Sequence, residues 1–204
     1  MIRLSIYAFA MALAAVAPAV HAIEEPAFTV ERQYDGFELR AYPPVLVAEV
    51  TVVGPADDAG NQGFRILAGY IFGKNKGERE IAMTAPVTQT PEPTKIAMTA
   101  PVTQAATEGG YTVQFTMPAA FTLATLPVPL DARIRLKEVP GKRYAVIRFT
   151  GFWSDANYTT HLEKLAQAVQ AAGVTTQGAP VYARYDAPWV PWFLRRNEIW
   201  LQVP

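Results

Sequence analysis

Short runs in which apolar and polar residues alternate, separated by Pro and Gly, restrict the fold of this chain more than any other feature of its sequence. Alternation with a period of two is typical of strands that bury one face. The pair Asp35-Gly36 lies between two such runs, which is a strong signal for a tight hairpin. We expect strands over residues 28–34, 37–42, 45–53, 111–117, 133–139, 144–152, 181–185 and 198–203.

Two segments depart from this alternation and have the spacing of amphipathic helices. The first covers residues 57–72, with Gly73 placed to end it, and its apolar stripe consists of Phe64, Leu67, Ala68 and Ile71. The second follows Ser154, a favourable N-cap, and stops before Gly173; its stripe consists of Leu162, Leu165 and Val169. Strands followed by a helix occur twice, so the sequence predicts one α+β domain with a mostly antiparallel sheet and two helices. An internally duplicated β-barrel is the form that we favour.

A nine-residue segment occurs twice without change, at residues 81–89 and 96–104. Residues 90–94 between the copies contain two prolines and are suited to a turn, so the two copies predict a hairpin. Pro86 and Pro101 each remove a backbone donor, which places them at an edge, at a bulge or at the end of a strand.

The first 22 residues have the composition of a secretory signal peptide. Arg3 supplies the positive start, residues 6–16 form an apolar run, and Val20 and Ala22 are small residues at the cleavage positions. A membrane anchor is the alternative, but the run is shorter than the roughly 20 residues that span a bilayer. We therefore expect a mature chain of residues 23–204 that forms one domain, is periplasmic or secreted, and has no transmembrane segment.

The charges balance, with 18 basic and 18 acidic residues, so nucleic acid is not an expected partner. The sequence has no cysteine, which excludes disulfides, thiolate metal ligands and a cysteine nucleophile. His161 is the one histidine of the expected mature chain, and we favour a hydrogen-bonded helix residue over a haem or metal ligand. Met83, Met98 and Met117 are interpreted as core-filling side chains. The sequence identifies no metal ligand.

Side chains suited to a flat organic ligand with carboxylates occur in two regions. The first is the apolar stripe of residues 57–72, together with the nearby cations Arg65, Lys74 and Lys76. The second is the aromatic segment that contains Tyr185, Trp189, Trp192 and Phe193. These residues alone indicate a small-molecule-binding module, although an aromatic core or a partner-binding patch would have the same composition.

Several motifs follow one another in order over nearly all of the expected mature chain. They are FELRAY at 37–42, GFR at 63–65, YIFGKN at 70–75, the repeated IAMTAPV, VQFTMP at 113–118, YDAP at 185–188 and RRNEIW at 195–200. Together they resemble the SOUL haem-binding family. The resemblance implies a distorted antiparallel β-barrel of two similar halves with two flanking α-helices. It also implies a binding protein, not an enzyme, that holds haem or a related tetrapyrrole in a hydrophobic groove by the first helix.

The functional residues of the family do not all carry over. Ala41 stands where one member is credited with an axial histidine, and Asn61 and Gly69 stand where another has basic residues for the propionates. We therefore expect contact through the faces and propionates of haem, with weak or absent axial ligation.

The predicted cofactor contacts are Phe64, Arg65, Leu67, Ala68, Ile71, Lys74, Tyr185, Trp189 and Trp192, and no catalytic residue is predicted. A carrier or buffer of haem is the leading interpretation. A non-haem module of the bacterial effector-binding type and a tetrapyrrole-modifying enzyme are the alternatives that the sequence leaves open.

Overall fold

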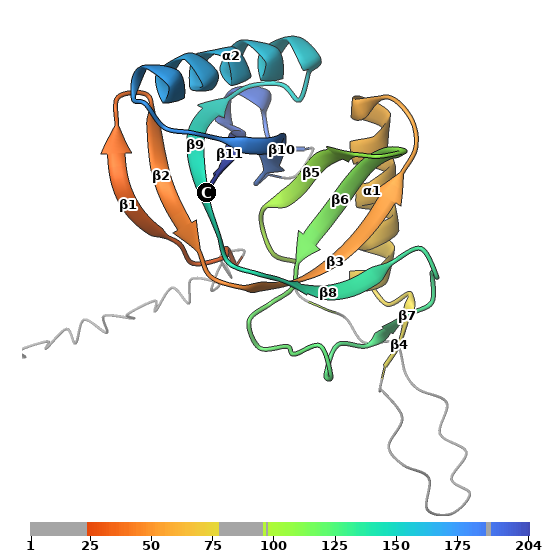
Figure 1. The fold of residues 1–204 in the computed structure, drawn as a ribbon. Helices are drawn as coiled ribbons and strands as arrows, with labels where there is room; N and C mark the ends of the chain where they lie inside the picture. The colour runs from red at the N-terminus through yellow and green to blue at the C-terminus, as the bar shows by residue number, and fades with distance from the viewer. Residues whose placement is uncertain (1–23, 78–95, 97, 187–188) are drawn as a thin grey trace, which may run out of the picture.

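The computed structural model describes residues 24–77, 96, 98–186 and 189–204 (Figure 1). Its strands are β1 (Thr29–Tyr34), β2 (Phe37–Tyr42), β3 (Val45–Val52), β4 (Asn75–Lys76), β5 (Val102–Thr107), β6 (Gly110–Thr116), β7 (Val128–Pro129), β8 (Arg135–Val139), β9 (Lys142–Thr150), β10 (Gln177–Arg184) and β11 (Arg196–Val203). Its helices are α1 (Ala56–Ile71), α2 (Asp155–Ala171) and the short 3-10 helix η1 (Trp192–Leu194).

Among these described residues, nine strands form one antiparallel sheet in the order β1-β2-β9-β11-β10-β5-β6-β3-β8, and two α-helices flank it. The sheet has two similar halves, because β3-α1-β5-β6 and β9-α2-β10-β11 each run in the order strand, helix, hairpin. The halves meet where β5 pairs with β10, from Val102 opposite Arg184 to Ala105 opposite Val181. The predicted α+β class, antiparallel sheet and two flanking helices are confirmed.

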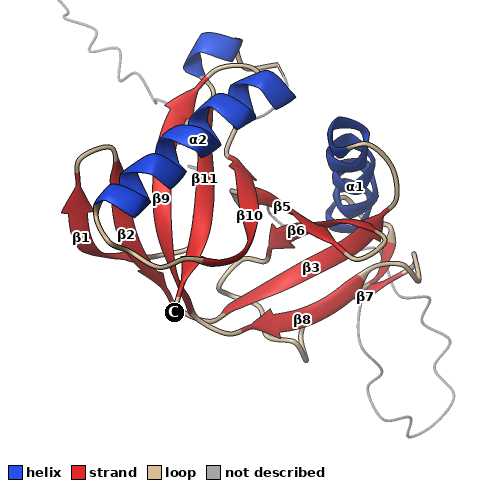
Figure 2. Ribbon diagram, turned by 45° about the horizontal axis from the view of Figure 1, so that its top comes forward, coloured by secondary structure: helices blue, strands red, loops and turns tan. Residues whose placement is uncertain are grey.

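Each helix covers one half of the sheet (Figure 2). α1 packs on β3 and β6, where Leu67 and Ile71 share a buried cluster with Phe115. α2 packs on β9 and β11, where Leu165 and Ile199 share a second cluster. The apolar stripe of each helix therefore faces the sheet, as the helical spacing predicts.

A glycine in the middle of α1 is explained by the close approach of the helix to the sheet. A Cβ at Gly63 would lie 2.5 Å from Cγ2 of Val113 on β6, which is closer than Cβ atoms pack. Glycine inside a helix is unfavourable by about 1 kcal/mol relative to alanine. The burial of α1 against β6 offsets this penalty, because the helix could not reach the sheet with a larger residue there.

The repeated segment contributes a strand at the junction of the halves. Its first copy and the turn that follows lie outside the described residues, as does the hairpin predicted between the copies. The second copy leads into β5, which pairs with both β6 and β10. Pro101 directly precedes β5, a position that suits a residue without a backbone donor.

The face of the sheet opposite the helices carries a buried ionic cluster. Glu198 on β11 is fully buried and accepts hydrogen bonds from Arg40, Tyr185, Arg196 and Trp200 at 3.1, 2.7, 2.8 and 2.9 Å. Burial opposes the charge of Glu198, but these hydrogen bonds and the two arginines outweigh it, so the pKa of Glu198 is lowered. The cluster therefore keeps the Glu198 carboxylate ionised although it is buried on this face of the sheet.

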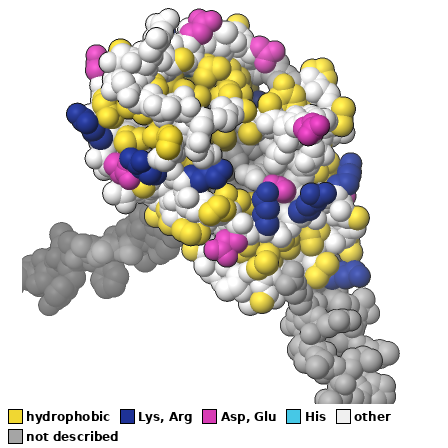
Figure 3. All heavy atoms as spheres, in the orientation of Figure 1, with side chains coloured by type: hydrophobic (Ala, Val, Ile, Leu, Met, Phe, Trp, Pro, Cys, Tyr) yellow, Lys and Arg dark blue, Asp and Glu magenta, His cyan; other side chains and the backbone are white. Residues whose placement is uncertain are grey.

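The surface reflects the balance of charge in the sequence. Basic and acidic side chains are interspersed on the face that Figure 3 shows, with no large area of one sign. Among the described residues, no helix is both long and apolar enough to span a membrane.

Candidate ligand-binding cleft

A cleft opens where the two halves of the sheet meet, on the face that carries the helices. We call it the junction cleft. It has two compartments that share Gln104 of β5 and Arg184 of β10. The α1 compartment is also lined by Gly60, Asn61, Phe64, Val102, Val113, Trp153 and Asp186. The tyrosine compartment is also lined by Ala106, Tyr111, Asp155, Tyr158, Thr159, Pro180 and Tyr182.

The two compartments differ in size and character. The α1 compartment has a volume of about 50 Å³ and mainly apolar walls. The tyrosine compartment has a volume of about 390 Å³, which lies in the range of roughly 300–1,000 Å³ typical of small-molecule sites. A ligand as large as a tetrapyrrole would therefore have to extend across both compartments.

Phe64 and Gly60 shape the α1 wall of the cleft. Phe64 is half-buried, and its ring centroid lies 5.4 Å from that of Phe115, so one side of the ring is held by the core. A Cβ at Gly60 would lie 2.5 Å from Oε1 of Gln104 and 3.2 Å from Nη1 of Arg184. Glycine at this position lets the start of α1 approach the opposite half of the domain.

Arg184 forms the centre of the opposite wall. Its Nε donates a hydrogen bond to the hydroxyl of Tyr158 at 3.0 Å, and its guanidinium carbon lies 5.0 Å from the ring centroid of Trp153. Arg195 lies over the same ring at 4.6 Å, so Trp153 supports two guanidinium groups. These contacts fix the position of Arg184 at the boundary between the compartments.

Tyrosine hydroxyls give the larger compartment its polar character. Burial, together with the neighbouring Tyr111 and Asp155, raises the pKa of the Tyr182 hydroxyl. Tyr182 therefore stays neutral at physiological pH and retains its proton for hydrogen bonding.

The predicted aromatic segment lies beside the cleft and is exposed. Trp189 is 82% exposed and Trp192 is 48% exposed. The Trp192 ring stacks on Phe152 at 4.9 Å, and Phe193 packs edge-on against Trp192 at 5.6 Å. Nε of Arg195 donates to the carbonyl of Val190 at 2.7 Å while its guanidinium lies over Trp153, which connects the segment to the cleft wall.

The structure separates the residues predicted to contact a cofactor. Phe64 lines the cleft, and Ala68 is half-buried against the core behind it. Arg65 is exposed and donates to the backbone carbonyl of Asn61 on its own helix, and Lys74 is exposed after the end of α1. Neither side chain lines the junction cleft among the described residues.

Three of the residues predicted to contact the cofactor, Leu67, Ile71 and Tyr185, do not line the junction cleft. Leu67 and Ile71 are fully buried under α1, because the apolar stripe of the helix is used to cover the sheet. Neither has surface to offer a ligand. The Tyr185 hydroxyl donates to Glu198 in the ionic cluster, so its side chain belongs to the opposite face of the sheet.

Several residues of the cleft were missed at the level of sequence. Arg184 precedes Tyr185 on a predicted strand, and alternation places the two on opposite faces. That signal identifies the face of Arg184 but gives no sign that β10 lies next to β5. The same holds for Gln104, Trp153 and Tyr182, which come together only through the pairing of the two halves.

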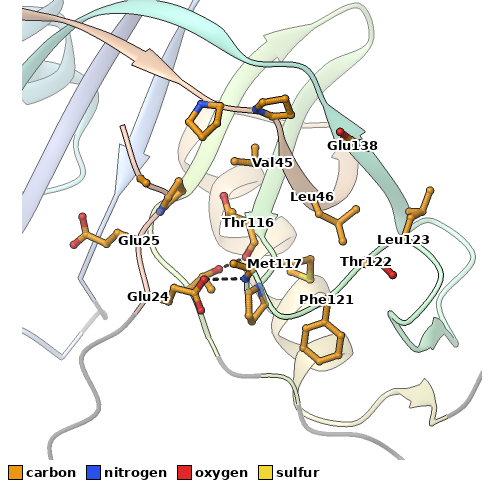
Figure 4. A pocket seen from close by; sticks show the side chains of 17 residues that line it. Glu24, Glu25, Val45, Leu46, Thr116, Met117, Phe121, Thr122, Leu123 and Glu138 are labelled. Carbon is orange, nitrogen blue, oxygen red and sulfur yellow. Dashed lines mark hydrogen bonds between the residues drawn. The ribbon is translucent and has the colours of Figure 1, made fainter. Parts of the chain in front are cut away.

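A larger pocket of about 520 Å³ lies elsewhere, between the segment after β6, the start of β3 and the first described residues (Figure 4). Met117, Phe121 and Leu46 form its apolar wall, and Glu24, Glu25 and Glu138 line its polar side. The carboxylate of Glu24 accepts a hydrogen bond from the backbone N–H of Ala119 at 2.8 Å. Among the described residues that line this pocket there is no Lys or Arg, so it is poorly matched to an anionic ligand.

The residues considered as metal ligands occupy structural positions. Nδ1 of His161 lies 2.8 Å from the carbonyl of Asn157, and its ring stacks on Phe149 at 4.0 Å, as expected for a hydrogen-bonded helix residue. Met117 is buried in the α1 cluster and Met98 packs against it, which confirms their interpretation as core residues, whereas Met83 lies outside the described residues. No cluster of three acidic or histidine side chains suited to a metal ion occurs in the described part of the chain.

The side chains that line the cleft are suited to a flat ring that bears a carboxylate. Phe64, Val102 and Trp153 offer apolar and aromatic surface, and Arg184 offers a cation.

The fold and the cleft define the class of protein: an α+β domain of two strand-helix-hairpin halves with a ligand-sized cleft at their junction. The chain belongs to the SOUL heme-binding protein family, whose family model matches residues 23–202. It is 28% identical over 167 residues to "Heme-binding protein 1" of Mus musculus, covering 81% of this chain and 83% of that protein. It is 29% identical over 189 residues to "Heme-binding protein 2" of Homo sapiens, covering 90% and 87%.

Two solved structures share the fold at low sequence identity. The EcmrR C-terminal domain matches with a TM-score of 0.54 and 14% identity, covering 81% of this chain and 95% of that one. A hydrolase from Listeria innocua matches with a TM-score of 0.55 and 12% identity, covering 90% and 94%. At this identity the likeness is one of fold alone.

Proposed function

We propose that this protein is an exported carrier or buffer of haem or a related tetrapyrrole, that it performs no chemistry on the ligand, and that the ligand lies in the junction cleft. Membership of the SOUL family supports a tetrapyrrole as ligand, and the names of the mouse and human relatives agree. Export rests on the signal-like residues 1–22.

One observation carries the choice of site. The junction cleft combines an apolar and aromatic wall with a fixed guanidinium, and this pairing matches a ring system that bears carboxylates. The larger pocket of Figure 4 has three glutamates and no basic residue in its described lining, whereas the junction cleft sets Arg184 beside its two aspartates, Asp155 and Asp186, so only the cleft offers a cation to the propionates of haem.

The site is tested by blocking the cleft without altering the core. Asn61 lies on the exposed part of α1 and lines the α1 compartment, so Asn61→Trp places an indole where the ring of the ligand would lie. Gln62→Trp is the matched control, because Gln62 is an exposed neighbour on the same helix that does not line the cleft.

The assay is a titration of residues 23–204 with haem, followed by the shift of its Soret band. We expect saturable one-to-one binding for the unmodified protein and Gln62→Trp, and binding at least tenfold weaker for Asn61→Trp, on the order of 1.4 kcal/mol. Unaltered binding by Asn61→Trp would place the ligand elsewhere. No saturable binding by the unmodified protein would favour the non-haem module.

Two further measurements separate the remaining parts of the proposal. Loss of haem with formation of a product over time would indicate an enzyme, whereas a carrier returns haem unchanged to an acceptor. Expression of the full chain in a Gram-negative host, followed by N-terminal sequencing of the periplasmic fraction, should give Ile23 as the first residue. A product that retains Arg3 and stays with the cells would refute export.

A further inference from the structure

We propose that Arg184 is the receptor for a carboxylate of the ligand, so that the junction cleft selects planar ring ligands with a free carboxylate over their neutral esters. The inference rests on the proposed function and names the chemical class that the same cleft accepts.

Arg184 forms no direct ion pair with a carboxylate among the described residues. Among the described residues that line the two compartments, it is the one basic side chain. Asp186, the carboxylate nearest to it in sequence, accepts a hydrogen bond from the backbone N–H of Arg196 at 2.6 Å. A half-buried guanidinium without an acidic partner is suited to bind an anion from outside.

The terminal nitrogens of Arg184 face the start of α1 across the α1 compartment. Nε is used by the Tyr158 hydroxyl, and the rings of Trp153 and Tyr158 lie 5.0 and 5.8 Å from the guanidinium carbon. Nη1 and Nη2 lie 3.2 and 3.4 Å from the place that a Cβ of residue 60 would occupy. Because residue 60 is glycine, it places no side chain of its own against these two donors, and the Gln104 amide oxygen lies 2.5 Å from the same point.

The position of Arg184 at the boundary of the compartments sets how the ligand would lie. The α1 compartment is too small for a whole ring system, and Arg184 also lines the larger tyrosine compartment. A ring placed against Phe64 and Trp153 thus brings a carboxylate on its edge to Arg184. The neutral Tyr182 hydroxyl beyond it adds a polar partner without adding negative charge.

Each compartment also contains an acidic residue, which limits the number of carboxylates that the cleft accepts. Asp186 lines the α1 compartment and Asp155 lines the tyrosine compartment. A second carboxylate of the ligand would therefore point away from the cleft, toward solvent.

The test compares protoporphyrin IX with its dimethyl ester, both added from the same solvent and followed by quenching of tryptophan fluorescence. Neither probe contains iron, so axial ligation cannot contribute. For the unmodified protein we expect the acid to bind at least about tenfold more tightly than the ester, as loss of a charge-assisted hydrogen bond implies. We also expect binding of the acid, but not of the ester, to weaken as salt is added.

The variants assign this preference to one side chain. Arg184→Met should lower affinity for the acid to that for the ester, and Arg184→Lys should keep part of the preference. Arg65→Met is the matched control, because Arg65 is an exposed arginine on α1 that does not line the cleft. Thermal unfolding of each variant identifies loss of folding, and the salt dependence of the unmodified protein tests the inference without any variant.

The outcomes for this inference and for the proposed function are distinct. Equal affinity for acid and ester in the unmodified protein, with both weakened by Asn61→Trp, would overturn the role of Arg184 and leave the cleft as the binding site. A preference that persists in a folded Arg184→Met would also overturn it. Absence of binding for both porphyrins would refute the proposed function itself.

Discussion

Glu198→Ala is expected to lower the free energy of unfolding by about 3–5 kcal/mol, the usual effect of removing one partner from a buried ion pair. Glu198 is fully buried and receives four different donor side chains. Arg40, only 4% exposed, would keep Glu38 as its one carboxylate partner among the described residues. Arg196 would keep its pair with Glu25. The penalty therefore comes from buried donors that lose Glu198 as their acceptor: Nη1 of Arg40, whose Nε keeps Glu38, the Tyr185 hydroxyl and the Trp200 indole N–H.

The measurement is urea-induced unfolding followed by tryptophan fluorescence, with Asp131→Ala as the control. Asp131 and Arg133 form an equally direct pair at 2.6 Å, but the Arg133 side chain is 60% exposed, so its loss should not change stability measurably. A cycle of Arg40→Met, Glu198→Met and the double variant should give a coupling energy of about 0.5–3 kcal/mol. A loss below about 1 kcal/mol for Glu198→Ala, or additive single effects, would refute the reasoning.

Three other predictions use the same cluster and the helix packing. The pKa of Glu198 is lowered from 4.5 in the folded protein, so ionised Glu198 contributes fully to stability above pH 4.5. This contribution is lost as the pH falls through the lower folded-state pKa. The free energy of unfolding should therefore fall less steeply with decreasing pH in Glu198→Gln than in the unmodified protein. Burial raises the pKa of Tyr42 to about 12, so Tyr42 should contribute little to the absorbance change of tyrosine ionisation between pH 9 and about 11. Tyr42→Phe should therefore show the same absorbance change as the unmodified protein over this range. A smaller change in the variant would contradict the prediction. Gly63→Ala should destabilise by about 1–3 kcal/mol through its contact with Val113. Gly69→Ala, where a Cβ would meet only the flexible Lys74 chain at 3.1 Å, should be neutral or stabilising by up to about 1 kcal/mol, and equal thermal shifts for both glycine variants would contradict this difference.

The elements of the fold were predictable because local patterns report burial directly. The stripe of residues 57–72 predicted α1 nearly to its ends, and Ser154 is the N-cap of α2, where its side chain accepts from the N–H of Asn157. The start of β10 at Gln177 was missed, because a register irregularity between Gln177 and Val181 breaks the alternation.

The site was less predictable because it depends on pairing across a long distance in sequence. A single apolar stripe can face only one layer, and in α1 that layer is the sheet, so Leu67 and Ile71 are core residues. Phe64, at the edge of the stripe, reaches the cleft. Arg184 faces it only because β10 pairs with β5, and alternation within either strand contains no information about that neighbour.

The pairing of β5 with β10 also means that a ligand in the cleft affects how strongly the two halves hold together. It is the one strand pair within the described sheet that joins the two strand-helix-hairpin halves. The cleft lies over this pair, with α1 forming one wall and Arg184 on the opposite wall. A ligand that contacts both walls would link the two halves of the domain. Part of its binding energy is therefore cohesion between the halves, and amide hydrogens of β5 and β10 should gain more protection from exchange on binding than those of the distant pair β1 and β2.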